Sequence, residues 1–290
     1  MQIGAMFPQM EIGTDPDKMR TYAETAEELG YGHLMVIEHV LGANVDRPDR
    51  HGRRWPHTSE EEFHEPFVLL GFLAAVTRRI ELATGVIVLP QRQTALVAKQ
   101  AAAVDVISRG RLRLGVGVGW NDVEFEALDM AFADRGRRIV EQIRVMRLLW
   151  TKPLVTFEGK WHRITDAGIN PLPVQRPIPI WMGGSAEPVL RRVGRITDGW
   201  SLSGEPGAET EAQWGRIKEY AREAGRDPAT IGLQGAIRYG DGNADRLRQV
   251  LDRWRQIGAT HVYINTVRSG LQSPDEHIAA LHTAKRALDF

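Results

Sequence analysis

Short β-type runs alternate with amphipathic helical segments along the whole chain. Parallel strands need a crossover connection, usually a helix, so this alternation predicts a parallel sheet made from βα units. Eight strands that are each followed by a helix close more naturally as a barrel than as an open sheet, so we expect an α/β fold, a (β/α)8 TIM barrel. The expected strands are residues 2–7, 33–37, 80–88, 111–118, 178–182, 199–202, 231–239 and 261–265.

The segments between these strands carry the signals of helix ends. In the first of them, Thr14 or Asp15 can cap a helix that has Pro16 at its first position, and Gly30 ends it. Its apolar residues share one face. Further helices are expected at residues 65–77, 94–108 and 134–150.

Two segments depart from the simple alternation. Residues 154–157 and 161–164 predict a hairpin inserted before the fifth barrel strand. The long loop 40–64 after the second strand is either a lid over an active-site face or a solvated, disordered loop. It carries Arg47, Arg50, His51, Arg53, Arg54, Trp55 and His57.

Length and charge limit the domain count and the partners. A chain of 290 residues fits a single barrel domain, residues 1–290. Basic and acidic residues balance at 37 each, so we expect neither nucleic acid nor a membrane surface as a partner. The chain has no cysteine, no basic leader before Pro8 and no apolar run approaching ~20 residues. A cytoplasmic protein that acts on a small molecule is the expectation.

The fourth strand ends in Gly115, Gly117 and Gly119, followed by Trp120 and Asn121. Alternate residues of a strand face the same side, so three side chains are missing from one side. A large flat ligand could press there, or the glycines serve tight packing inside the barrel. The pattern is not a dinucleotide-binding fingerprint, because the spacing of the third glycine and a barrel context are both wrong.

Three other strand ends carry candidate groups. The fifth strand, through Met182, runs into Gly183-Gly184-Ser185 before a helix, which is either a phosphate cradle or a simple helix cap. Glu38 and His39 follow the second strand, where His39 either transfers a proton or serves as a structural hydrogen bonder. Gly85 interrupts the third strand, as a backbone irregularity or a barrel-core glycine.

Several catalytic patterns are missing from the sequence. It contains no His-x-His or His-Glu-x-x-His spacing for a metal, no Gly-x-Ser-x-Gly elbow and no phosphate-binding loop of the NTPase type. We therefore predict no metal site.

Two stretches together resemble the bacterial luciferase-like flavin oxidoreductases, most closely the branch that depends on coenzyme F-420, an 8-hydroxy-5-deazaflavin. The first stretch is 94–121, with Gln100, Asp105, Ser108-Arg-Gly-Arg111 and Leu114 to Asn121. The second runs from Pro171 through Gly183-Gly184-Ser185 to Trp200. The resemblance begins at the first strand and is weak after residue 205.

The resemblance implies a deazaflavin, or alternatively FMN, lying across the barrel mouth with its phosphate near Gly183–Ser185. It implies a cis peptide bond at Gly85–Val86 under the ring, and it makes Glu38 and His39 the catalytic pair, with His39 as the proton donor or acceptor. The residues expected to contact the cofactor are Gly85, Val86, Gly117, Gly119, Trp120, Asn121, Met182, Gly183, Gly184 and Ser185. It also implies a homodimer formed through helices 66–77 and 94–108.

The sequence departs from the family's sugar-phosphate dehydrogenases at two positions. They resemble it in fold but have a carboxylate where Trp120 stands and a tryptophan where Ala43 stands, so we do not expect that reaction. The expected function is hydride transfer between a deazaflavin and a small organic substrate. The alternatives are an FMN-dependent two-component monooxygenase and a flavin-binding barrel without catalysis.

Overall fold

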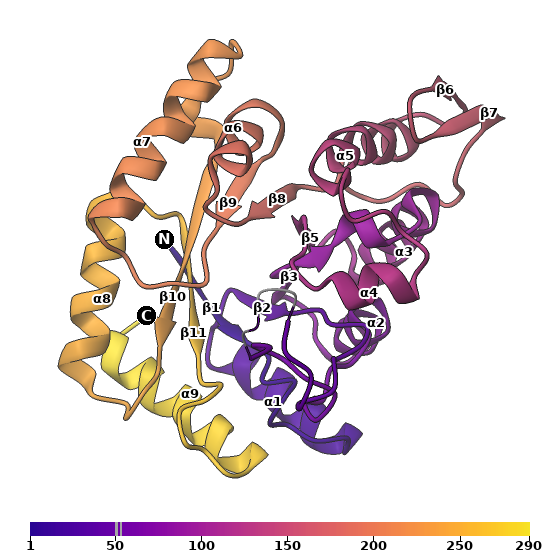
Figure 1. Ribbon diagram of the computed structural model, residues 1–290. Coiled ribbons are helices and arrows are strands. Elements are labelled where there is room, and N and C mark those ends of the chain that lie inside the picture. The colour runs from indigo at the N-terminus through magenta and orange to yellow at the C-terminus, as the bar shows by residue number, and fades with distance from the viewer. Residues whose placement is uncertain (50–51, 53) are drawn as a thin grey trace.

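Nine parallel strands form one closed sheet in the computed structural model, which describes residues 1–49, 52 and 54–290. β3 and β4 occupy one position of the barrel, because both pair with β5, and β1 closes the circle with β11. The predicted eight-stranded TIM barrel is confirmed (Figure 1). The strands are β1 (Gln2–Met6), β2 (His33–Val36), β3 (Glu81–Thr84), β4 (Ile87–Val88), β5 (Leu112–Gly117), β8 (Ile180–Gly183), β9 (Gly199–Ser201), β10 (Gly232–Arg238) and β11 (His261–Asn265).

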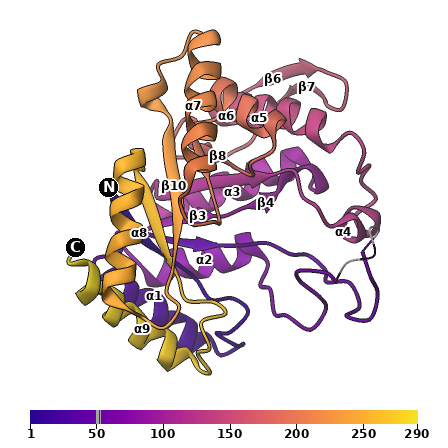
Figure 2. The same ribbon diagram turned by 60° about the vertical axis from the view of Figure 1, so that its left-hand side comes forward.

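Helices surround the barrel and bury their apolar faces against it (Figures 1 and 2). The first begins as predicted: Asp15 accepts a hydrogen bond from the N–H of Asp17, and Pro16 follows it. Gly30, at a φ of 85°, ends that turn. The helices are α1 (Pro16–Glu28), α2 (Pro66–Val76), α3 (Thr94–Ser108), α4 (Asp122–Ala127), α5 (Arg135–Thr151), α6 (Glu187–Ile196), α7 (Ala208–Glu223), α8 (Ala244–Ile257) and α9 (Pro274–Leu288), with short 3-10 turns η1 (Leu89–Gln91) and η2 (Pro228–Thr230).

The third barrel strand is not continuous, although the sequence predicted one run over residues 80–88. A cis peptide bond joins Gly85 to Val86, as the resemblance implied, and separates β3 from β4. The hydroxyl of Thr84 donates to the carbonyl of Gly115 at 2.7 Å and accepts its N–H at 2.8 Å. This side chain therefore replaces the backbone pairing that the break removes. Below it we call residues 85–88 the bulge.

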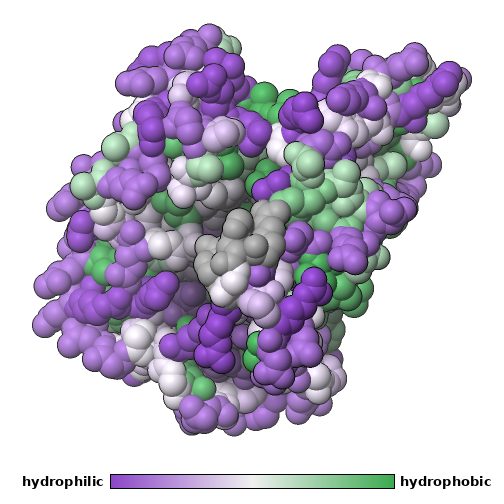
Figure 3. All heavy atoms as spheres, viewed as in Figure 1, coloured by the Kyte–Doolittle hydropathy of each residue, from purple (hydrophilic) through white to green (hydrophobic). Residues whose placement is uncertain are grey.

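The predicted hairpin forms a separate two-stranded sheet, β6 (Val155–Glu158) and β7 (Arg163–Ala167), which projects beyond α5 in Figure 1. Its second strand begins two residues later than predicted. The carboxylate of Glu141 accepts the N–H groups of Lys160, Trp161 and His162 at 2.8–2.9 Å, so these residues form the turn instead of the strand. Figure 3 shows hydrophilic residues covering this hairpin and α7, whereas apolar surface gathers around α4.

Two apolar clusters stabilise the barrel. The larger lies between the strands and the surrounding helices. The smaller, inside the barrel, contains Met6, Met35, Ala83, Ala236 and Tyr263. Within the described ranges, no helix combines the length and the apolar character needed to cross a membrane.

Candidate active site

The C-terminal ends of the barrel strands surround a cavity of about 1110 Å³. Ten of the twelve predicted site residues line it, whereas Asn121 and Met182 do not. Met182 is buried in the apolar core. Asn121 caps α4 with its side-chain oxygen and donates its amide to the carbonyl of Leu41 at 3.2 Å. The ten lining residues are Glu38, His39, Gly85, Val86, Gly117, Gly119, Trp120, Gly183, Gly184 and Ser185.

The glycines at the end of β5 make room for the protein's own bulge. A Cβ atom at Gly117 would lie 2.6 Å from Cγ2 of Val86. One at Gly115 would collide with the carbonyl oxygen of Thr84, and one at Gly119 with the side chain of Val88. Packing inside the barrel thus accounts for all three glycines, while Gly117, Gly119 and Val86 also line the cavity. The ligand side of this wall is the bulge, seated on the glycines.

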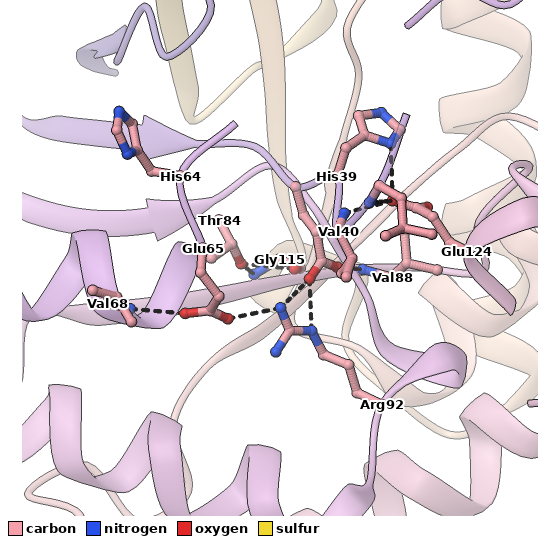
Figure 4. Close-up of polar contacts among 12 residues, drawn as sticks. His39, Val40, His64, Glu65, Val68, Thr84, Val88, Arg92, Gly115 and Glu124 are labelled. Atoms are coloured by element: carbon pink, nitrogen blue, oxygen red, sulfur yellow. Dashed lines mark hydrogen bonds and ion pairs between the residues drawn. The ribbon is translucent and has the colours of Figure 1, made fainter. Parts of the chain in front are cut away.

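Glu38 supports the bulge from behind (Figure 4). Its buried carboxylate accepts hydrogen bonds from the backbone N–H of Val88 and from Nε of Arg92, the latter at 2.6 Å. Arg92 also pairs at 2.8 Å with Glu65, which caps α2. Burial raises the pKa of the Glu38 carboxyl, and the guanidinium of Arg92 opposes that rise. These contacts are those of a residue that holds the bulge in place; the predicted catalytic role of Glu38 stays a prediction.

His39 stands at the cavity with one ring nitrogen turned into the protein. Its Nδ1 lies 3.3 Å from Oε1 of Glu124, a carboxylate that is 1% exposed (Figure 4). The rings of His57, Phe63 and Trp120 lie 4.7, 4.8 and 5.4 Å from the His39 ring, centroid to centroid. Our sequence analysis missed Glu124, although a carboxylate one helical turn after Trp120, beyond a strand end, was a usable signal.

The described part of loop 40–64 packs onto the cavity mouth. The buried ring of Trp55 lies 5.8 Å from that of Trp120. Arg268, after β11, fastens the loop by donating to the carbonyl of Pro56 at 3.0 Å. Burial, followed by the charges of His39 and Arg268, lowers the pKa of His57 to about 4. This placement favours the lid interpretation; Arg50, His51 and Arg53 lie outside the described residues.

The segment after β8 presents backbone groups to the cavity. Ser185 does not cap α6, because the N-cap is Ala186, so the capping alternative is wrong. The indole of Trp200 donates to the carbonyl of Gly184 at 2.7 Å. Since a trans peptide points its N–H away from its carbonyl, the N–H of Ser185 is directed away from Trp200. This N–H and the exposed Ser185 hydroxyl suit an anion at the start of α6.

Arginines from the C-terminal third also line the cavity, and the sequence analysis missed them. They are Arg238, Arg246 and Arg268, at or after the ends of β10 and β11. Arg246 donates to the carbonyl of Arg238 at 2.7 Å and pairs with Glu205. The rule that ligands bind at strand ends would have found Arg238 and Arg268 had it been applied to the last two strands. The described residues contain no group of His, Asp and Glu side chains suited to a metal ion.

Comparison with known proteins gives a match to the family described as luciferase-like monooxygenase over residues 2–288. An uncharacterised protein of Mycobacterium tuberculosis (strain ATCC 25618 / H37Rv) is 34% identical over 76% of this chain and 77% of its own length. An F420-dependent glucose-6-phosphate dehydrogenase of Segniliparus rotundus is 29% identical over 75% of this chain and 62% of its own. The crystal structure of the monooxygenase RslO1 from Streptomyces bottropensis superposes with a TM-score of 0.79 at 21% identity, covering 99% of this chain and 98% of that one, and shares the fold.

Proposed function

The chain belongs to the luciferase-like monooxygenase family, and we propose that it transfers a hydride between a deazaflavin coenzyme, F-420, and a small organic substrate. The prediction that it is an enzyme of this family is confirmed. The observation that carries the proposal is the placement of His39 at the cavity, held from behind by Glu124. The F420-dependent relative favours the deazaflavin over other cofactors.

The residues at the cavity fit such a coenzyme. About 1110 Å³ exceeds the size of most small-ligand pockets, roughly 300–1,000 Å³, and leaves room for a ring and a substrate together. Val86 and Gly117 would border the ring, and Gly183–Ser185 would hold a phosphate through backbone N–H groups and the serine hydroxyl. When bound, a deazaflavin supplies a carbon that accepts or gives a hydride.

The chain's own contribution is the proton and the exclusion of water. His39 would take the hydroxyl proton when an alcohol is oxidised, or give a proton to the oxygen when a carbonyl is reduced. The aromatic rings of Trp55, His57 and Trp120 would keep water from the reacting atoms. Trp120 had left open a barrel without catalysis, since it replaces a carboxylate; Glu124 now provides a carboxylate at His39.

An FMN-dependent monooxygenase is the second candidate. The anion site at Gly183–Ser185 would accept the phosphate of FMN as readily as that of F-420, and the packed loop 40–64 would exclude water from an oxygen reaction. No metal enters either proposal.

We also propose a homodimer acting in the cytoplasm on a small molecule. Three apolar side chains on α2 and α3 face solvent: Val68 is 74%, Leu96 51% and Ile107 56% exposed. Apolar residues this exposed on neighbouring helices mark an interaction surface.

The test uses purified protein with oxidised F-420 and a panel of alcohols, and with reduced F-420 and a panel of aldehydes and ketones. We expect loss or recovery of the coenzyme's visible absorbance with at least one substrate. His39→Ala should abolish it, while the control His282→Ala, on the exposed face of α9, should retain it. Oxygen-dependent turnover of reduced FMN, with none of F-420, would establish the second candidate instead.

A further inference from the structure

We propose that Glu124 is the positioning residue of this site: it fixes the orientation and the tautomer of His39, so that the proton-accepting nitrogen, Nε2, faces the cavity. The catalytic consequence rests on the proposed function. The tautomer itself does not.

The first observation is the position of Glu124. It lies on α4, one turn beyond Trp120, whose side chain points partly to solvent and is 42% exposed. Trp120 occupies the place where the sugar-phosphate dehydrogenases of the family have a carboxylate. In this chain the carboxylate nearest to His39 comes from the following helical turn, and it is buried.

The second observation is that three donors converge on one oxygen. Oε1 of Glu124 accepts the N–H of Val40 at 2.6 Å and that of Leu41 at 3.4 Å, besides facing Nδ1 of His39. Asn121, at the start of the same helix, donates to the carbonyl of Leu41. Two side chains of α4 therefore hold the backbone that follows His39 through both its N–H and its C=O groups.

The chemistry of the pair fixes the proton on His39. An ionised carboxylate only accepts hydrogen bonds, so Nδ1 must carry the hydrogen. In the neutral ring, Nε2 then has a free lone pair and is the proton acceptor. The rings of His57, Phe63 and Trp120 pack around the imidazole and oppose a flip that would exchange the two nitrogens.

A purely structural role for Glu124, as a clamp on residues 40–41, makes a different prediction. Glu124→Gln keeps the side-chain volume and an oxygen for the N–H of Val40, so a clamp would survive it. It removes the negative charge and brings an amide donor that can face Nδ1 and select the other tautomer. Carboxylate-to-amide changes beside a catalytic histidine act in this way.

The ring nitrogens of His39 give the direct test. Protein labelled with ¹⁵N is examined by NMR at mildly alkaline pH through the couplings between ring nitrogens and carbon-bound protons, and His39 is assigned from the signals lost in His39→Gln. We expect the Nδ1–H form in the unsubstituted protein and a shift towards the Nε2–H form in Glu124→Gln. Glu126→Gln, an exposed glutamate of the same helix, is the matched control and should leave the spectrum unchanged. A ring of the Nε2–H form before substitution, or identical His39 signals in Glu124→Gln, would overturn the proposal.

Turnover gives a second readout where a substrate is found. Because Glu124 acts through His39, Glu124→Gln should lower kcat by about 10²- to 10⁴-fold with little change in KM. Adding it to His39→Gln should cost almost nothing more. Losses that multiply in the double variant would contradict the proposal. Absence of all F-420 turnover would count against the proposed function alone, since the NMR result stands without a substrate.

Discussion

The guanidinium of Arg92 donates to the buried carboxylate of Glu38, which at the same time accepts the backbone N–H of Val88 in the bulge. Removing one partner of a buried ion pair leaves an uncompensated charge, which typically costs about 3–5 kcal/mol. We therefore expect Arg92→Ala to lower the free energy of unfolding by an amount in this range, as measured by urea denaturation.

The matched control for this prediction is Arg20→Ala. Arg20 pairs with Asp17 on the exposed surface of α1 at 3.6 Å, and such surface pairs contribute roughly 0–1 kcal/mol. Equal losses in the two variants would show that the Arg92–Glu38 pair does not support the bulge.

Gly117→Ala should push the bulge out of place. Its Cβ atom would lie 2.6 Å from Val86, and overpacking in a core usually costs about 1–3 kcal/mol. Weaker coenzyme binding should accompany the loss of stability, since Val86 lines the cavity. Gly215→Ala on α7 is the control: its Cβ meets open space, and alanine should stabilise the helix by roughly 0.5–1 kcal/mol. Unchanged stability and binding in Gly117→Ala would contradict the packing described for the glycines.

Acid should weaken the fold through two histidines. Burial lowers the pKa of His57 to about 4 and that of His261 to about 3, from 6.5. Between these values and 6.5 the unfolded chain binds more protons than the folded one, so stability decreases as the pH falls through this window. Urea denaturation at neutral and at mildly acidic pH should show a smaller loss in His261→Gln than in the unsubstituted protein. An equal loss would mean that His261 is not the group responsible.

The proposed dimer predicts the effect of a charge on α3. Leu96→Glu should lower the mass measured by light scattering from two chains to one, because a buried carboxylate without a partner is costly at an interface. Leu154→Glu, equally exposed but placed before β6, should leave the mass unchanged. A single-chain mass before any substitution would remove the proposal.

The barrel could be predicted from the sequence because its signals are local. Each strand shows as a short β-type run, and each helix end has its own cap, as with Asp15 and Gly30. The start of β7 was missed because a side chain distant in sequence, Glu141, takes the N–H groups of the turn. No local pattern indicates such a contact.

The site was predicted where single residues stand at strand ends, and missed where a residue acts through another. His39 and Gly183–Ser185 line the cavity as expected. Glu124 could not be assigned, because its partners precede it by more than eighty positions. The glycines of β5 were visible, but their neighbour, the bulge, became known only from the closed barrel.

The central claim is that the cavity binds a deazaflavin. Purified protein is titrated in parallel with oxidised F-420 and with FMN, and the quenching of each coenzyme's fluorescence is followed to saturation. The account predicts saturable binding of F-420 that is weakened in Gly117→Ala and retained in Gly215→Ala. Saturable binding of FMN with none of F-420 would contradict it.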